Sequence, residues 1–273
     1  MTKSLSAAQI AQFETDGYLF PLDCMSAAEA TDCRTRFEAF EREAGNSAHK
    51  VLRIKSHLIF PWLVEIARHP KILDAIEDLI GPNILAYLSS LWFKNANDPS
   101  YVSWHQDSAY YGLDPHDVVI MWFAFTDSTR ANGCVRVLPG THRDPDHRHD
   151  ETYAADNLLS RGQSIPGIDE TGAVDMELRA GQFSLHHERV VHGSRPNGTD
   201  DRRLGMSIVY VPSRVRSVVG RRSALLVRGT DAYGHWDRDP EPRFDLDPVC
   251  LEVMERWIRG YEDTAVTQEA ERG

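Results

Sequence analysis

The sequence predicts a mainly β fold with flanking helices, built around a double-stranded β-helix (a jelly-roll, cupin-like core). Three observations indicate this fold. Two capped helical segments open the chain, many short runs rich in Val, Ile, Leu and aromatic residues follow, and residues that favour turns separate those runs. Short strands at such spacing are typical of sandwiches and barrels, whereas βαβ units would alternate strands with helices.

The N-terminal part, residues 1–82, is predicted to be helical. A first helix starts at Ser6 and stops at Gly17. In a second helix, Ser26 is a suitable N-cap, Glu29 is its capping-box partner, and Gly45 ends the helix.

A third helical stretch covers about 60 to 80, with a break near His69 and Pro70. The jelly-roll core then extends over 83–230. Its expected strands are ILAYLSSLWFK, VVIMWFAFTD, CVRVLP, AVDMELR, QFSLHH, VVHGS and RLGMSIVYV.

One long segment, about 140–173, interrupts the strands. It is rich in Asp, His, Arg and Gly, and only Tyr153 to Leu159 has a helical pattern. A loop of this length in a compact domain is usually functional or disordered, and we interpret it as a lid over a pocket. Its histidines fit a solvated lid better than a second metal site. A final helix is expected over about 248–263, and the whole chain, 1–273, is expected to be one domain.

Composition excludes several classes of protein. A net charge of −11 argues against general nucleic-acid binding. The longest apolar run, from Val118 to Phe125, is too short to span a bilayer, and no signal-peptide core is present. The four cysteines have no CxxC spacing and are interpreted as reduced thiols. We therefore expect a cytoplasmic protein without a membrane partner.

The most informative motif is His105-Gln106-Asp107 in SWHQDSAYY. Side chains two residues apart on a strand leave the same face, so His105 and Asp107 can reach one point. His192, in the separate strand-like segment VVHGSRPN, supplies a second imidazole. Two histidines and one carboxylate on one side of a metal are the facial triad of non-haem Fe(II) oxygenases. An HxD pair alone is weak evidence, because it also occurs on solvent-facing strands.

Arg203, where the next strand begins, strengthens the interpretation. A 2-oxoglutarate bound to iron by its keto acid end needs a cation for its far carboxylate. Arginine offers a planar, two-pronged donor that stays charged in a pocket. Ser194 is placed either to add a hydroxyl donor to the same carboxylate or to serve as a turn residue.

These motifs resemble the phytanoyl-CoA dioxygenase (PhyH) family of Fe(II)/2-oxoglutarate-dependent oxygenases. The segments FETDGYLF, WHQD, MWFAFTDSTRANGCVRVLPGTHR and VVHGSRPN…RRLGMSIVY match its pattern in order, over about residues 10 to 260. SALLVRGTDAYGHWDRDPEP is similar to the branch with non-haem halogenases. The resemblance implies that His105, Asp107 and His192 hold iron. It further implies that Arg203 and Ser194 hold 2-oxoglutarate, that Trp122 lines its site, and that O2 is the other cosubstrate.

One departure from the halogenases bears on the reaction. In those enzymes a small residue replaces the ligand aspartate and leaves room for a halide, whereas this chain keeps Asp107. We therefore expect hydroxylation of an unactivated C–H bond in specialised metabolism, with release of succinate and CO2. Desaturation, ring closure and halogenase-like chemistry are the nearer alternatives, and a non-catalytic jelly-roll that binds a small ligand is the more distant one.

The sequence offers only a few candidates for contact with the substrate. Tyr110 and Tyr111 follow the HxD motif, and His187 is the member of the His186-His187 pair expected to face the pocket. Lys55 and Arg53 precede the sheet, at a position from which their side chains could reach the pocket mouth. A group of arginines after Pro212 fits either a solvated surface or a contact with an anionic or carrier-bound substrate. These are Arg214, Arg216, Arg221, Arg222 and Arg228.

Overall fold

The computed structural model describes residues 2–45 and 52–259. Its helices before the main sheet follow the predicted stops and starts. Ser6 and Ser26 both form capping boxes, with Gln9 and Glu29. These elements are α1 (Ala7–Asp16), α2 (Ala27–Ala44), the 3-10 turn η2 (Ser56–Leu58), α4 (Pro61–Ala67) and α5 (Pro70–Ile80).

Two sheets form the core, as the fold class predicts. The large sheet has the strand order β1-β10-β5-β12-β2-β14-β15, and the small sheet has the order β3-β11-β6-β9. Every pairing inside both sheets is antiparallel except β14 with β15. The large-sheet strands are β1 (Tyr18–Asp23), β2 (Ile84–Lys94), β5 (Val119–Ala124), β10 (Gln182–His187), β12 (Arg203–Pro212), β14 (Ser223–Arg228) and β15 (Asp237–Arg238). The small-sheet strands are β3 (Val102–His105), β6 (Val135–Val137), β9 (Val174–Asp175) and β11 (His192–Ser194).

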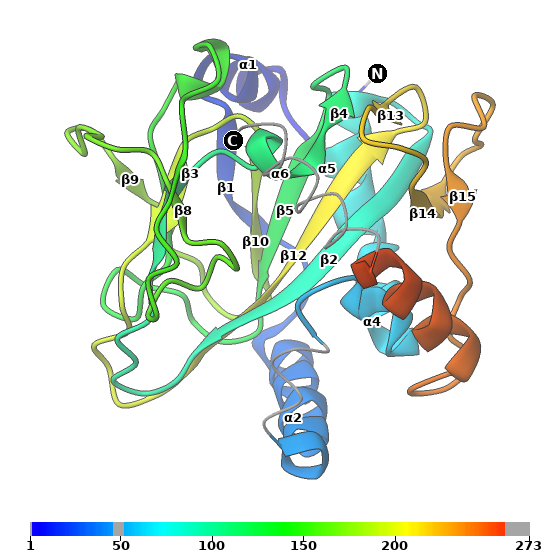
Figure 1. Ribbon diagram of the computed structural model, residues 1–273, viewed down its shortest axis with the longest axis horizontal. Coiled ribbons are helices and arrows are strands. Elements are labelled where there is room, and N and C mark those ends of the chain that lie inside the picture. Colours follow the sequence, from blue (N-terminus) through cyan, green and yellow to red (C-terminus); the bar gives the residue numbers. More distant parts are fainter. Residues whose placement is uncertain (1, 46–51, 260–273) are drawn as a thin grey trace.

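Helices α2, α4 and α5 cover one face of the large sheet, and the small sheet lies to its other side (Figure 1). The largest apolar cluster joins α4 and α5 to alternate residues of the large sheet, among them Phe123 and Ile208. Burial of such side chains is the main favourable term in folding. The opposite face of the sheet is left to line a cavity between the two sheets.

The segment after the first helix departs from the prediction. Residues 18–23 belong to the part predicted to be helical, yet they form strand β1 at the edge of the large sheet. Pro21 lies inside this strand, and an edge position tolerates it because one side of the strand needs no ladder donors. The mainly helical reading of residues 1–82 therefore misses one strand.

The lid segment contains three small elements, which are the 3-10 turn η3 (Thr141–Arg143) and two short strands. It has no helix over Tyr153–Leu159, which corrects that prediction. Strands β7 (Asp150–Glu151) and β8 (Gln163–Ser164) pair with each other. Tyr153 has a left-handed φ of 50°, which a helix cannot contain. Tyr101 forms a bridge with Asn157, so the contact with the start of β3 overrides the local helical pattern.

The C-terminal helix occupies 248–259 within the described residues, and the remainder of its predicted range lies outside them. Its Trp257 packs against Tyr87 near the end of the large sheet.

Each of the four cysteines is a free thiol. Within residues 2–45 and 52–259, no helix has the length and apolar character needed to cross a membrane.

Candidate metal centre and cosubstrate pocket

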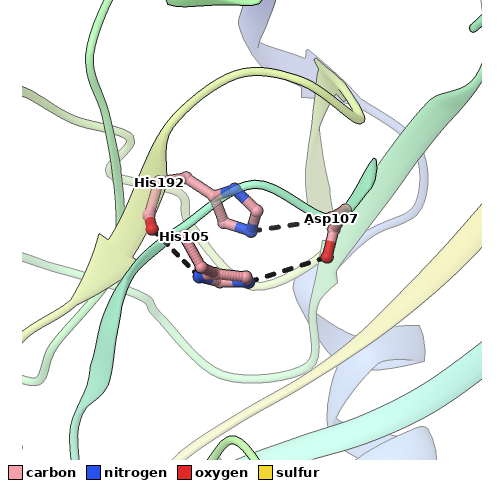
Figure 2. A group of neighbouring side chains, drawn as sticks. All are labelled: His105, Asp107 and His192. Atoms are coloured by element: carbon pink, nitrogen blue, oxygen red, sulfur yellow. Dashed lines mark hydrogen bonds and ion pairs between the residues drawn. The ribbon is translucent and has the colours of Figure 1, made fainter. Parts of the chain in front are cut away.

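Three buried side chains converge at the small sheet, as Figure 2 shows. His105 ends β3 and His192 begins β11, and these two residues are direct partners across the antiparallel ladder. One ligand atom from each of His105, Asp107 and His192 lies within 4.8 Å of the others. The predicted triad is therefore brought together, with its histidines held by strand register.

Asp107 reaches the centre by a different route from the predicted one. Strand β3 ends at His105, and Asp107 has helical backbone angles at the start of the short helix α6 (Ser108–Tyr111). The Asp107 carboxylate lies 3.6 Å from Nε2 of His105 and 3.8 Å from Nε2 of His192. A turn rather than strand alternation therefore aims it at the two imidazoles.

Backbone carbonyl groups fix the orientation of both imidazoles. Nδ1 of His105 donates to the carbonyl oxygens of Ser103 at 2.9 Å and of His192 at 3.1 Å. Nδ1 of His192 donates to the carbonyl oxygen of Val190 at 3.0 Å. Because a carbonyl only accepts, each Nδ1 carries the proton and each Nε2 keeps its lone pair for a metal.

The charge state of the centre suits a divalent cation. Burial raises the pKa of Asp107, but the neighbouring His192, His105 and His186 lower it by more, so the carboxyl pKa lies well below its usual range. Burial, and then the neighbouring His105, lower the pKa of His192 well below its usual value. An ionised carboxylate and a neutral imidazole are the forms that ligate metal ions.

The cavity beside the triad has a volume of about 210 Å³ and contains most of the predicted site residues. It is lined by all three triad residues, by Arg203, Ser194 and Trp122, and by Tyr110 and Tyr111. Burial, and then the nearby Asp107, raise the pKa of Tyr111 well above its usual value.

Arg203 is a buried cation without a carboxylate partner among the described residues. Its residue exposure is 2%, its Nε has no hydrogen-bond partner, and its guanidinium lies over the Trp122 ring at 5.2 Å from the ring centroid. Gly205 allows this arrangement, since a Cβ there would lie 2.2 Å from the Trp122 ring. An unpaired buried charge is costly, so the pocket is built for an incoming anion.

Lys94, the last residue of β2, lies beside the site although no sequence motif marks it. It is the ladder partner of Arg203, is fully buried, and donates from Nζ to Ser194 Oγ at 2.7 Å and to the Arg195 carbonyl oxygen. Burial, then repulsion by Arg203, lower the pKa of Lys94 to about 6. Its position at the end of an apolar run gave it the pattern of an ordinary strand terminus.

The prediction for the His186-His187 pair is wrong. His186 lines the cavity, with its Nε2 3.7 Å from Asp107 Oδ2. His187 is absent from the cavity lining and lies against the His142 ring, with its Nδ1 accepting from the Arg189 N–H at 3.1 Å. Residues on both faces of β10 are buried, so alternation alone does not say which side faces the cavity.

The lid is tied to the metal centre through Gln106, between the two ligands. Gln106 accepts from the backbone N–H of His147 at 2.8 Å, and its own backbone N–H donates to Nε2 of His149 at 3.0 Å. The lid histidines therefore hold the loop in place, and they join no metal-binding group among the described residues.

A mainly antiparallel jelly-roll with two histidines and an aspartate at one end defines a candidate mononuclear metal enzyme of the non-haem iron class. The phytanoyl-CoA dioxygenase (PhyH) family model matches residues 13–205. The chain therefore belongs to the phytanoyl-CoA dioxygenase family and so to the Fe(II)/2-oxoglutarate-dependent oxygenases.

Individual relatives agree with this assignment. A probable alpha-ketoglutarate-dependent hypophosphite dioxygenase of Stutzerimonas stutzeri is 30% identical over 66% of this chain and 64% of the relative, just under two thirds of its length. A probable phytanoyl-CoA dioxygenase of Caenorhabditis elegans is 27% identical over 94% of this chain and 93% of its own. The structure of the non-heme monooxygenase ThoJ without metal superposes with a TM-score of 0.85 at 34% identity, covering 97% of this chain and 100% of that one.

Proposed function

We propose that this protein is an Fe(II)/2-oxoglutarate-dependent oxygenase that hydroxylates an unactivated C–H bond of a small molecule. One observation carries the proposal: a triad of candidate metal ligands opens into the same cavity as a buried arginine that has no counterion among the described residues. ThoJ, a non-heme monooxygenase, has also been seen as a nickel complex with the same overall fold.

Each site residue has a distinct task in this proposal. His105, Asp107 and His192 would hold Fe(II), while Arg203 would bind the far carboxylate of 2-oxoglutarate next to Ser194, whose hydroxyl Lys94 contacts from behind the cavity wall. When bound, iron, 2-oxoglutarate and O2 supply the oxidation: the substrate C–H becomes C–OH as 2-oxoglutarate and O2 give succinate and CO2. The protein orients the reactants and keeps water out of the cavity.

The ligand set favours hydroxylation over halogenation. Asp107 fills the position that a halide would need, and its carboxylate is ionised and aimed at the imidazoles. Desaturation and ring closure start from the same hydrogen abstraction, so the identity of the product distinguishes them.

Conversion of 2-oxoglutarate to succinate tests the proposal. The purified protein with Fe(II) is expected to form succinate, and substrates are found by screening for compounds that accelerate it. Products are then analysed with chloride present, where the proposal expects hydroxylated and no chlorinated product. A protein that binds metal yet forms no succinate under any condition contradicts the enzyme assignment.

Binding of 2-oxoglutarate is expected to take up a proton near neutral pH. With a pKa of about 6, Lys94 is mostly neutral at pH ~7.5, and an arriving carboxylate raises that pKa. The affinity for 2-oxoglutarate should therefore fall as pH rises above about 6. Calorimetry in two buffers of different ionisation enthalpy measures the uptake, which Lys94→Met should abolish. An uptake that survives in Lys94→Met would mean that another group takes up the proton.

The substrate is proposed to carry an anionic group that pairs with Arg53. This side chain lines the cavity, lies over the Trp92 ring at 4.3 Å, and donates to the Leu158 carbonyl oxygen of the lid. Burial lowers the pKa of Arg53 to about 10, and no carboxylate among the described residues forms an ion pair with it. Tyr87, Leu88 and Trp257 add an apolar wall for the rest of the molecule.

The arginines after Pro212 support a small free anion rather than an acidic carrier. Four of them already pair with carboxylates of this chain, and Arg222 lies over the Trp257 ring. These pairs are Arg214 with Asp117, Arg216 with Asp114, Arg221 with Asp237, and Arg228 with Asp74 and Glu77. Little uncompensated positive charge is left there to attract a carrier.

A panel of small carboxylates and phosphonates, each with its neutral amide or ester, tests the role of Arg53. Acids that stimulate succinate formation should lose about 10- to 100-fold in kcat/KM in Arg53→Met, since a hydrogen bond to a charged group contributes about 1.5–3 kcal/mol. The KM for 2-oxoglutarate should not change, and Arg53→Lys should retain part of the effect. Equal stimulation by acids and by their amides would contradict an anionic substrate.

A further inference from the structure

His186 is the one imidazole of the cavity wall that the proposed function leaves without a task. It lies on β10 of the large sheet, between Tyr18 of β1 and Ile120 of β5 in the strand register. Its residue exposure is 2%, and neither Nδ1 nor Nε2 has a hydrogen-bond partner. Leaving a buried polar group unsatisfied costs about 1–3 kcal/mol, so such a group marks a place where a partner is expected.

The partner within reach is the carboxylate of Asp107. Nε2 of His186 is 3.7 Å from Asp107 Oδ2, about 0.7 Å beyond a usual N–H···O hydrogen bond. Oδ1 of the same carboxylate faces His105, whereas Oδ2 lies between His192 and His186. The carboxylate is thus approached by ligand imidazoles from the small sheet and by His186 from the large one.

We propose that His186 is a positioning residue that donates from Nε2 to the Asp107 carboxylate and holds it in the orientation that binds the metal. The proposal rests on the proposed function, because it assumes a metal on the triad. Carboxylates that ligate metals are themselves hydrogen-bonded in most proteins, which restricts their rotation and improves their affinity. Asp107 needs such a restraint because it lies beyond the end of β3, outside the strand ladder.

Two other roles are open to a buried imidazole in this place, and geometry weighs against one of them. As a fourth ligand, His186 would have to join the group of ligand atoms that lie within 4.8 Å of one another, and that group contains only His105, Asp107 and His192 among the described residues. A hydrogen bond to substrate is the second role, and it is an outcome that the test separates.

The test uses the full-length protein and Co(II), a redox-stable probe whose visible spectrum reports coordination. His186→Leu is expected to weaken Co(II) binding about 10- to 100-fold, as loss of an outer-shell partner does, with unchanged positions of the Co(II) bands. His186→Gln keeps an N–H donor and should recover most of the affinity. His187→Leu, which changes the adjacent imidazole outside the cavity, should bind Co(II) as the wild type does.

The outcomes separate the proposal from its rivals. Wild-type affinity in His186→Leu, or a Gln variant no better than the Leu variant, would overturn the positioning role. Altered Co(II) bands would instead make His186 a ligand. Normal Co(II) affinity with a raised substrate KM would make it a substrate contact. If the wild type itself binds no Co(II), the proposed function fails, which is a distinguishable result.

Discussion

Arg203→Met is expected to abolish productive binding of 2-oxoglutarate without destabilising the folded protein. Within the part of the chain that the structure describes, the buried guanidinium has no counterion, and an apolar side chain of similar volume removes its desolvation penalty. The melting temperature without ligands should therefore equal or exceed that of the wild type. The cosubstrate, in contrast, loses a charge-assisted pair, which typically costs about 2–5 kcal/mol, so its KM should rise about 30-fold or more.

Arg202, the preceding residue, provides the matched control, because its substitution is expected to have the opposite effects on stability and on cosubstrate binding. Arg202 donates to Glu41 at 2.7 and 3.0 Å and to Asn95 at 2.9 Å, outside the cavity. Arg202→Met should lower the melting temperature and leave the KM for 2-oxoglutarate unchanged. If Arg203→Met keeps the wild-type KM, the cosubstrate is anchored elsewhere.

Features decided by neighbouring residues were predictable from the sequence. The capping boxes at Ser6 and Ser26 and the helix stops at Gly17 and Gly45 are confirmed, since each depends on a few adjacent residues. The turn residues between apolar runs also located β2, β10 and β12. The metal triad was predictable because His105 and Asp107 are two residues apart, so only His192 had to be found elsewhere in the sequence.

Features decided by tertiary partners were not predictable. Strand β1 forms because its edge pairs with β10, and the lid segment near Asn157 follows β3 rather than its own helical pattern. Alternation gives the periodicity of β10 but does not say which face meets the cavity, so the pattern predicts His187 where the structure has His186. Lys94 became recognisable only when the register placed it opposite Arg203.

Asp107→Asn is expected to remove metal binding and, with it, succinate formation. The substitution preserves the shape of the side chain but removes the one negative charge among the three ligands, which is the main attraction for a divalent cation. Loss of an outer-shell partner typically costs about 10- to 100-fold in affinity, and loss of a charged ligand should exceed this range. The simplest readout is the metal-dependent rise in unfolding free energy, about 2.7 kcal/mol when metal is at 100 times its Kd.

A second buried aspartate shows whether any loss is specific to the centre. Asp239 is buried against Lys55 and His57, away from the cavity lining. Breaking a buried pair by removing one charge typically costs about 3–5 kcal/mol, so Asp239→Asn should unfold at a lower temperature. It should nevertheless keep the full gain in stability on adding Co(II), whereas Asp107→Asn should lose that gain. An Asp107→Asn protein that Co(II) stabilises as strongly as the wild type would mean that the metal does not depend on this carboxylate, and the facial-triad assignment would have to be abandoned.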